Sequence, residues 1–464
     1  MRLCIFALCC GVVGFAQDHS AMLNRMTGDA PKYAALSRQI WEFAETGFQE
    51  QKSSALLVKE LKAAGFKVET GVAGMPTAFV ASIGQGKPVI AILGEYDALP
   101  GLSQQTVPEK MPVVEGANGH GCGHNLFGVA TVQAVTELKR LMEERKIPGT
   151  LRLYGTPAEE GGGGKIHMIR AGLFQDVDAA ITWHPWDVNA ATNQNWLATV
   201  AGRFKFTGRA AHAAASPENG RSALDGAMIM THALDLMREH VPQETRMHYI
   251  FEKAGAAVNI VPDNTELVMM ARHPSKEVLA GIWERILNCA QAGALATGTQ
   301  VSFEVTGSYA NMMSNRTLTT LVDRMMRVAG GYKYTPDEAA FADGIRKTLS
   351  APGSDEGHET ILPVIEGIFS ASTDVGDVSY VVPTVQFLAA TWVPGTSAHT
   401  WQSTAASGMS IGQKGMLVAA RTLALTGLAL FTEPQTLQAA KAEFRKASAG
   451  KTYNSLHPKE VRMR

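Results

Sequence analysis

Three potential metal ligands lie on alternate residues of one glycine-rich stretch, residues 119–125 (GHGCGHN). In an extended loop, side chains two residues apart point to the same side, so His120, Cys122 and His124 are able to converge on one ion. Polar and reactive side chains between glycines make a poor core, and we therefore predict that Cys122 and His124 bind metal. His120 is either a third ligand or a supporting residue, because three ligands in so short a stretch are crowded.

Two adjacent carboxylates follow later in the chain. Glu159 and Glu160 come after a strand-like run, residues 151–155 (LRLYG). In isolation, such a pair is typical of the start of a helix, where acids are favoured. Hydrolysis at a metal, however, requires a ligand and a base beside the attacking water, and two neighbouring glutamates supply one of each. We predict Glu160 as the ligand and Glu159 as the base that later protonates the leaving amine.

Further candidates follow apolar runs that read as buried strands. Asp97 comes after residues 88–93, and His184 comes after residues 178–183. In open α/β sheets, sites assemble where the parallel strands end, so both side chains are expected near the two glutamates. His399 lies in a loop far along the chain. Like His184, it is either a ligand or an ordinary polar residue.

Two other patterns indicate different chemistry. His212 lies in a stretch of different texture and is the kind of residue that reaches over a site to stabilise an oxyanion. Residues 408–412 (GMSIG) match the nucleophile elbow of serine hydrolases. No apolar strand precedes them, and His457 is the only histidine that follows, so we exclude a serine hydrolase of this type.

The length and charge of the chain limit the classes of protein to consider. A chain of 464 residues exceeds what one core usually fills, which favours two domains. The formal net charge of −1 gives no overall attraction to nucleic acid or to a membrane surface. Residues 197–308 follow the order strand-helix-strand-strand-helix-strand, a split α+β sandwich. We expect them to be inserted between catalytic residues 17–196 and 309–432, with residues 433–464 as a polar tail that forms one surface helix.

The first 16 residues have the features of a targeting segment. Arg2 precedes the apolar residues 3–15, and small residues end the segment at Ala16. The apolar run is too short to span a bilayer, and we expect no membrane span elsewhere. We predict cleavage after Ala16 and a secreted or periplasmic protein; a lipid-anchored cysteine fits poorly. Cys122 and Cys289 then remain, too few for a disulfide framework.

Seven motifs are distributed along the chain: residues 41–48 (WEFAETGF), 97–100 (DALP), 121–124 (GCGH), 157–161 (PAEEG), 184–185 (HP), 208–216 (GRAAHAAAS) and 259–263 (NIVPD). Taken together, they resemble the di-metal aminoacylase/carboxypeptidase family, in its hippurate hydrolase-like amidohydrolase branch. The resemblance implies a mixed-sheet α/β/α catalytic domain of di-metal exopeptidase type with an inserted, ferredoxin-like lid that dimerises. Within the branch, GCGHN in place of ACGHD is similar to the type that acts on aminobenzoyl-glutamate.

The family pattern also implies roles for individual residues. Carried onto this chain, it makes five residues the ligands of two divalent ions: Cys122, His124, Glu160, His184 and His399. Glu159 becomes the general base. Independently of the resemblance, we expect Asp97 and His120 to support the ligands. Asn259 and Arg272 become candidate contacts for the substrate carboxylate, and His212 reaches the site of a neighbouring subunit. A cysteine ligand suits manganese, zinc or cobalt.

We therefore expect a binuclear metal-dependent amidohydrolase that uses metal-bound water. Its substrates are expected to be N-acyl or N-aroyl amino acids such as p-aminobenzoyl-glutamate. A metallo-dipeptidase or carboxypeptidase on the same scaffold is the alternative, and it differs by requiring a free α-amine on the acyl side. A catalytically inactive metal- or peptide-binding protein is the third hypothesis, against which the complete ligand set argues. The expected partner is a second copy of the chain, bound through the lid.

Overall fold

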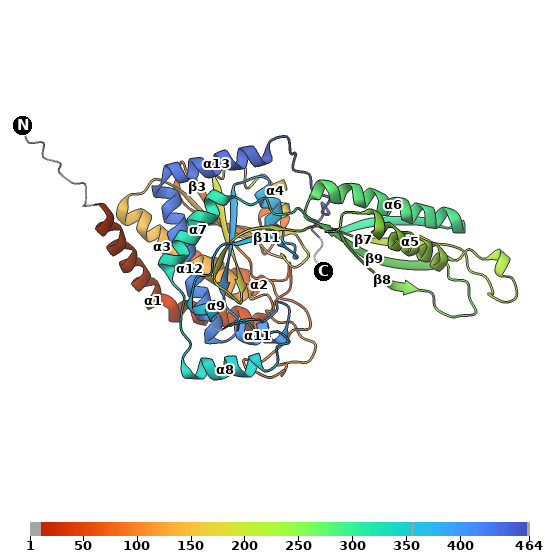
Figure 1. Cartoon of the computed structure of the whole chain (residues 1–464), viewed down its shortest axis with the longest axis horizontal. Helices are drawn as coiled ribbons and strands as arrows, with labels where there is room; N and C mark the ends of the chain where they lie inside the picture. Colours follow the sequence, from red (N-terminus) through yellow and green to blue (C-terminus); the bar gives the residue numbers. More distant parts are fainter. Residues whose placement is uncertain (1–10, 355, 462–464) are drawn as a thin grey trace, which may run out of the picture.

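The computed structural model describes residues 11–354 and 356–461, in a larger α/β part and a smaller α+β part that extends from it (Figure 1). In the larger part, helices lie on both faces of a central sheet. In the smaller part, two helices cover one face of a second sheet. Residues 1–10 of the predicted targeting segment lie outside the described residues. The predicted α/β fold class is confirmed.

The central sheet has eight strands in a mixed arrangement. In spatial order they are β1 (Lys67–Thr70), β2 (Phe79–Gln85), β4 (Gly149–Gly155), β3 (Val89–Gly94), β5 (Ala179–Trp186), β12 (Thr384–Ala390), β6 (Ala190–Trp196) and β11 (Ile365–Phe369). The middle strands β4, β3, β5 and β12 are parallel to one another, whereas β2 and β6 run antiparallel to β4 and β12. Both faces of the middle strands are covered, and every residue of β3 and β12 is buried.

The larger part contains helices on both sides of this sheet. They are α1 (Gly11–Phe43), α2 (Gln51–Ala63), α3 (His124–Arg145), α4 (Gly164–Arg170), α7 (Arg316–Ala329), α8 (Pro336–Arg346), α9 (Glu356–Glu359), α10 (Val375–Ser379), α11 (Trp401–Ser407), α12 (Ser410–Thr432) and α13 (Pro434–Ser448), with a 3-10 turn η1 (Val72–Gly74). Side chains of α1, α3, α7 and α12 form the main core with one face of the sheet, and α4 and α10 cover the other. Successive strand residues point to opposite faces, so Ile92 packs in the first layer and Leu93 in the second.

Helix α12 lies at the centre of the main core. Among the residues that the structure describes, it is the one helix long and apolar enough to cross a membrane. Its most apolar window is 83% buried inside the protein, where it contacts α3, α7 and β5. A core helix passes the same test of length and composition, and the packing of α12 accounts for its apolar sequence.

The smaller part is a separate antiparallel sheet with two helices. Its strands, in spatial order, are β10 (Gln300–Tyr309), β7 (Ala198–Thr207), β9 (Asn264–His273) and β8 (Arg246–Ala254). Helices α5 (Ala223–Met237) and α6 (Lys276–Thr297) connect them, with 3-10 turns η2 (Pro217–Asn219) and η3 (Arg238–His240). This strand order is that of a ferredoxin-like sandwich. Residues of β9 alternate between half-buried and buried because the helices cover one face only.

The C-terminal residues differ from the single surface helix that the sequence predicted. Helix α13 ends at Ser448, and Gly450 has a φ of +73°, a left-handed conformation that turns the chain out of the helix. Residues 449–461 then continue without a regular helix or strand. One face of α13 is also buried, through Leu437 and Ala440. The polar composition of the tail gave no sign of these contacts.

The carboxyl ends of the middle strands collect the polar candidates. Asp97 follows β3, Glu159 and Glu160 follow β4, and His184 lies near the end of β5. Because β4, β3 and β5 are parallel neighbours, their ends lie at the same edge of the sheet. Segments that are distant in the sequence are thereby brought to one place.

Candidate metal centre

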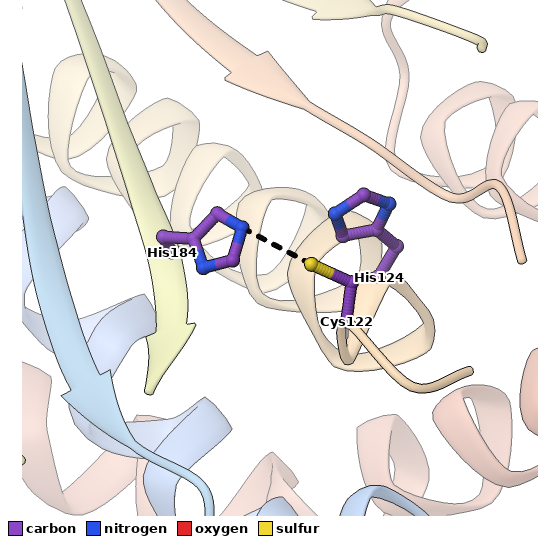
Figure 2. Close-up of side chains that lie close together, drawn as sticks. All are labelled: Cys122, His124 and His184. Atoms are coloured by element: carbon purple, nitrogen blue, oxygen red, sulfur yellow. Dashed lines mark hydrogen bonds between the residues drawn. The ribbon is translucent and has the colours of Figure 1, made fainter. Parts of the chain in front are cut away.

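Cys122, His124 and His184 converge at this edge of the sheet (Figure 2). Each offers one ligand atom, and these atoms lie within 4.8 Å of one another. The Cys122 Sγ is 3.4 Å from the Nε2 of His184. Cys122 lies in the turn before α3, and His124 is the first residue of that helix. Gly123 between them has a φ of +73°, and a Cβ there would meet the Pro185 side chain at 2.8 Å.

Hydrogen bonds fix the orientation of both histidines. The Nδ1–H of His124 donates to Asp97 Oδ1 at 2.9 Å, and that of His184 donates to the carbonyl of Pro185 at 2.7 Å. Each ring therefore directs its Nε2 toward the site, which is the usual arrangement of metal-binding histidines. Burial lowers the pKa of His184 to about 3, so its imidazole is neutral, the form that binds a cation.

A second group of ligand atoms shares Cys122. It contains Glu160 and His399, whose Oε1 and Nε2 lie 3.1 Å apart. His399 has a φ of +61°, which is strained for a residue with a side chain, and its N–H donates to the carbonyl of Gly121. Burial raises the pKa of the Cys122 thiol well above its ordinary value, whereas a bound divalent cation would deprotonate it. Cys122 thus stands where it would be able to contact two ions.

A third group consists of Glu95, His124 and Glu159, all buried. Burial, followed by the nearby carboxylates of Glu95 and Glu160, raises the pKa of Glu159 well above its ordinary value. A carboxylate with a raised pKa holds a proton more readily, as a general base must when it receives one. Glu159 is also fixed through its backbone, since the Tyr309 hydroxyl donates to its carbonyl at 2.9 Å.

The donor set fits divalent cations. Three buried side-chain atoms that face the site make no hydrogen bond, although each lies 3.1 or 3.2 Å from another ligand atom: the His124 Nε2, the Glu160 Oε1 and the Glu95 Oε2. Buried polar atoms usually make hydrogen bonds, and these belong to the ligand types that bind transition metals. The His124 Nε2 and the Glu95 Oε2 lie 3.2 Å apart, a separation that one shared cation is able to bridge.

Sequence reasoning missed the residues that hold Glu95. The Lys165 Nζ lies 2.7 Å from Glu95 Oε1 and 2.6 Å from Asp374 Oδ1, and all three side chains are buried. The Lys165 N–H also donates to Asp374 Oδ2 at 3.0 Å. This network ties the start of α4 to the end of β3. Glu95 stands two residues before Asp97, at the same strand end. That position in the sequence could have identified Glu95 as a site residue.

Other predicted site residues lie outside the three ligand groups. His120 is buried, and its Nε2–H donates to the carbonyl of Ile40 at 3.0 Å, so it fastens α1 to the ligand loop. The Nδ1 of His212 accepts from the backbone N–H groups of Ala214 and Ala215 in a loop of the smaller part. Asn259 is exposed in another loop there. The structure brings Asp97, but neither His212 nor Asn259, into contact with the ligands.

Arg272 opens onto a separate cavity of about 520 Å³. Arg246, His248 and Glu244 line the same cavity. Ile368 in strand β11 lines it from the larger part. Arg246 lies directly opposite Arg272 on neighbouring antiparallel strands. Like charges in such a pair repel, and burial lowers the pKa of Arg272. The arrangement favours an anion between the two guanidinium groups.

Comparisons with known proteins identify the family of the chain. The chain matches the pattern of peptidase family M20/M25/M40 over residues 91–424, and it belongs to that family. It is 39% identical to one of the subunits of the p-aminobenzoyl-glutamate hydrolase of Escherichia coli, over 94% of this chain and 97% of that protein. It is 33% identical to the Xaa-Arg dipeptidase of Mus musculus, over 91% of each chain.

Solved structures give the same fold. The aminobenzoyl-glutamate utilization protein of Klebsiella pneumoniae matches with a TM-score of 0.63 and 17% identity, covering 87% of this chain and 97% of that one. A dinuclear metal-binding M20 peptidase of Bacillus subtilis matches with a TM-score of 0.60 and 16% identity, covering 89% and 99%. The predicted family is confirmed, and the chain is a metal-dependent hydrolase of the amidohydrolase and peptidase class that uses divalent ions.

Substitution of Cys122 tests the shared ligand. Because its sulfur belongs to two ligand groups, we expect Cys122→Ser to weaken the binding of both ions by about tenfold or more. Cys289→Ser is the matched control, since that cysteine lies in α6, away from the site. Elemental analysis after gel filtration measures the ions per chain. An unchanged metal content in Cys122→Ser would contradict the assignment.

Proposed function

We propose that this chain hydrolyses the amide of N-acyl or N-aroyl amino acids at a centre of two divalent ions, with p-aminobenzoyl-glutamate as the first substrate to test. The observation that carries the proposal is the position of buried Glu159 beside two groups of ligands that share Cys122, one of them fully buried. The named activity of the Escherichia coli hydrolase, one subunit of which is 39% identical over nearly the full length, supports this choice of substrate.

The protein's own residues have distinct tasks in this proposal. Bound divalent cations would polarise the scissile carbonyl and lower the pKa of water to roughly 7. The Glu159 carboxylate then accepts a proton from the attacking water and passes it to the leaving nitrogen. Asp97 holds the His124 ring, and its second oxygen accepts from the N–H of Glu160 at 2.9 Å, so both ligands keep their direction. Manganese or zinc, with cobalt as a third choice, suits a site of cysteine, histidine and carboxylate.

The cavity at Arg272 is our candidate for the carboxylate of the leaving amino acid. Arg272 makes its side-chain contacts with the Met270 sulfur at 3.2 and 3.3 Å, a weak acceptor for a guanidinium group. With Arg246 and His248 nearby, the cavity offers enough donors for an amino acid with a second carboxylate, such as glutamate. Asn259 and His212 are proposed to complete this contact from a neighbouring subunit.

A dipeptidase is the second candidate. The 33% identity to the mouse Xaa-Arg dipeptidase over 91% of both chains favours it. It would act at the same ligands, and it differs in requiring a free α-amine on the acyl side. Parallel assays with an N-acylated dipeptide and its free form separate the two activities.

We further propose that the chain dimerises through the smaller part, which would act as a lid, and that it is secreted or periplasmic. Exposed apolar side chains on α5, Met228 and Leu236, and Ile250 on the edge strand β8, support an interface there. Two Escherichia coli relatives are named as different subunits of one hydrolase, which leaves a second type of chain open as the partner. The export proposal rests on residues 1–16 alone.

Replacement of the base tests the proposed reaction. Glu159→Gln keeps the shape of the side chain but removes its ability to take a proton, so we expect kcat to fall by about 10²- to 10⁴-fold. The metal content should stay unchanged, because Glu160 remains. Glu143→Gln, on the exposed face of α3, is the control. Release of glutamate from p-aminobenzoyl-glutamate measures kcat, and undiminished turnover in Glu159→Gln would refute the role of this residue.

The cationic cavity makes a separate prediction about the leaving group. Each charged hydrogen bond contributes about 1.5–3 kcal/mol, so Arg272→Ala should raise the KM for p-aminobenzoyl-glutamate by about 10- to 100-fold. Arg246→Ala should affect p-aminobenzoyl-glutamate more than the corresponding glycine conjugate, which lacks a second carboxylate. Arg285→Ala on α6 serves as the control. Equal effects of Arg246→Ala on both substrates would contradict recognition of a dicarboxylate.

A further inference from the structure

A second cavity, of about 340 Å³, lies beside Glu160 and is built from two distant regions of the chain. Phe48 and Leu99 line it from the larger part. His457, Pro458 and Glu460 line it from the C-terminal segment, defined here as residues 453–461. The C-terminal segment therefore stands next to a predicted metal ligand.

Several side chains hold the C-terminal segment in place. The guanidinium of Arg170 in α4 donates to the carbonyls of His457 and Pro458, each at 2.6 Å, and to that of Ser455 at 3.3 Å. The Tyr453 hydroxyl donates to Asp377 Oδ1 at 2.8 Å. Backbone carbonyls that meet a charged donor form strong hydrogen bonds. The segment is thus a fixed wall of the cavity.

His457 connects this wall to the loop that carries the two glutamates. Its ring is buried, and burial lowers its pKa to about 4, so it is neutral and has one donor and one acceptor. The Nε2–H donates to the carbonyl of Gly162 at 3.0 Å, and the Nδ1 accepts from the N–H of Ser308. The ring also stacks on Tyr309, whose hydroxyl holds the carbonyl of Glu159.

The loop that follows Glu160 leaves space for the ring of His457. A Cβ at Gly163 would lie 2.7 Å from the ring of His457, and Gly163 has a φ of +64°. A residue with a side chain would therefore meet both a clash and backbone strain at this position. His457 therefore fits against Gly163, which lies three residues after Glu160 in the loop of the two glutamates.

The charges around the two cavities indicate which half of a substrate each one receives. Glu160 and Glu460 line the cavity beside the metal ligands, and no lysine or arginine lines it among the described residues. A carboxylate is disfavoured there, whereas Arg246 and Arg272 favour one in the other cavity. The apolar side chains of Phe48 and Leu99 suit an aromatic or aliphatic group.

We propose that the C-terminal segment forms one wall of the subsite for the acyl group, and that His457 positions the loop of Glu159 from behind. The subsite takes an uncharged aromatic or apolar acyl group of about the size of one substituted ring. Pro458 and Glu460 determine which acyl groups fit, and His457 is a positioning residue. This inference rests on the proposed hydrolysis of N-acyl amino acids.

The wall is tested by the preference among acyl groups. The full-length double variant P458A/E460A is compared with Lys459→Ala, an exposed neighbour that does not line the cavity. The substrates are benzoyl-, p-aminobenzoyl- and 2-naphthoyl-glutamate. We expect P458A/E460A to shift kcat/KM toward the naphthoyl substrate by about tenfold relative to the benzoyl one, as for a pocket that gains room. Lys459→Ala should leave the ratio unchanged.

An unchanged preference in P458A/E460A, with active wild-type protein, would overturn the role of the wall. A wild-type protein that cleaves none of the three substrates would instead refute the proposed function. The two failures are therefore distinguishable from one set of assays.

The positioning role is tested by a split between kcat and KM. His457→Ala removes the support of the loop, and we expect kcat to fall by about tenfold or more while KM and the number of bound ions change little. His457→Gln, which offers one donor and one acceptor, should restore most of kcat. The inference fails if kcat is unaffected in His457→Ala, or if it falls only in proportion to lost metal.

Discussion

The two hydrogen bonds of Asp97 hold the site together. One carboxylate oxygen accepts from the Nδ1–H of His124, and the other accepts from the N–H of Glu160, each at 2.9 Å. These bonds connect the ends of β3 and β4 to the start of α3. Asp97 is fully buried, so neither bond competes with water. Ligands from separate segments therefore keep one fixed geometry, which metal binding requires.

The charge balance of the site depends on cations. Asp97, Glu95, Glu159 and Asp374 are buried within one region, and buried Lys165 pairs with two of them, Glu95 and Asp374. Burial raises the pKa values of Glu95 and Glu159, because separate negative charges are costly in the interior. Divalent ions at the neighbouring ligands would relieve this cost. The same electrostatics separate a negative cavity near Glu160 from a positive one near Arg272.

The sequence allowed prediction of the parts whose signal is local. Cys122 and His124 stand out because alternate ligands between glycines have no better structural explanation, and Glu159 because it adjoins a second acid after a strand. The α/β class was also predictable from a local signal, because the middle strands are continuous apolar runs. The role of His120 was not predictable from ligand spacing alone. Its hydrogen-bond partner, the carbonyl of Ile40, lies in α1, and no pattern in the ligand loop indicates that contact.

The remaining features arise from contacts between distant segments. Lys165 reads as an ordinary helix residue until the fold places Glu95 and Asp374 around it. Arg246 becomes a candidate for anion binding only because the strand register places it opposite Arg272. The polar tail read as a surface helix, whereas His457 is buried against the glycine loop. The roles of such residues depend on tertiary contacts, and these cannot be predicted from helix and strand propensity or from hydrophobic periodicity.

The most direct test of the central claim is metal content together with turnover in the same preparation of the protein. Ions per chain and release of glutamate from p-aminobenzoyl-glutamate are measured before chelation, after chelation, and after manganese or zinc is added back. The account predicts about two ions per chain, loss of turnover with the ions, and recovery on addition. Full turnover in metal-free protein, or no bound metal and no activity under any condition, would contradict it.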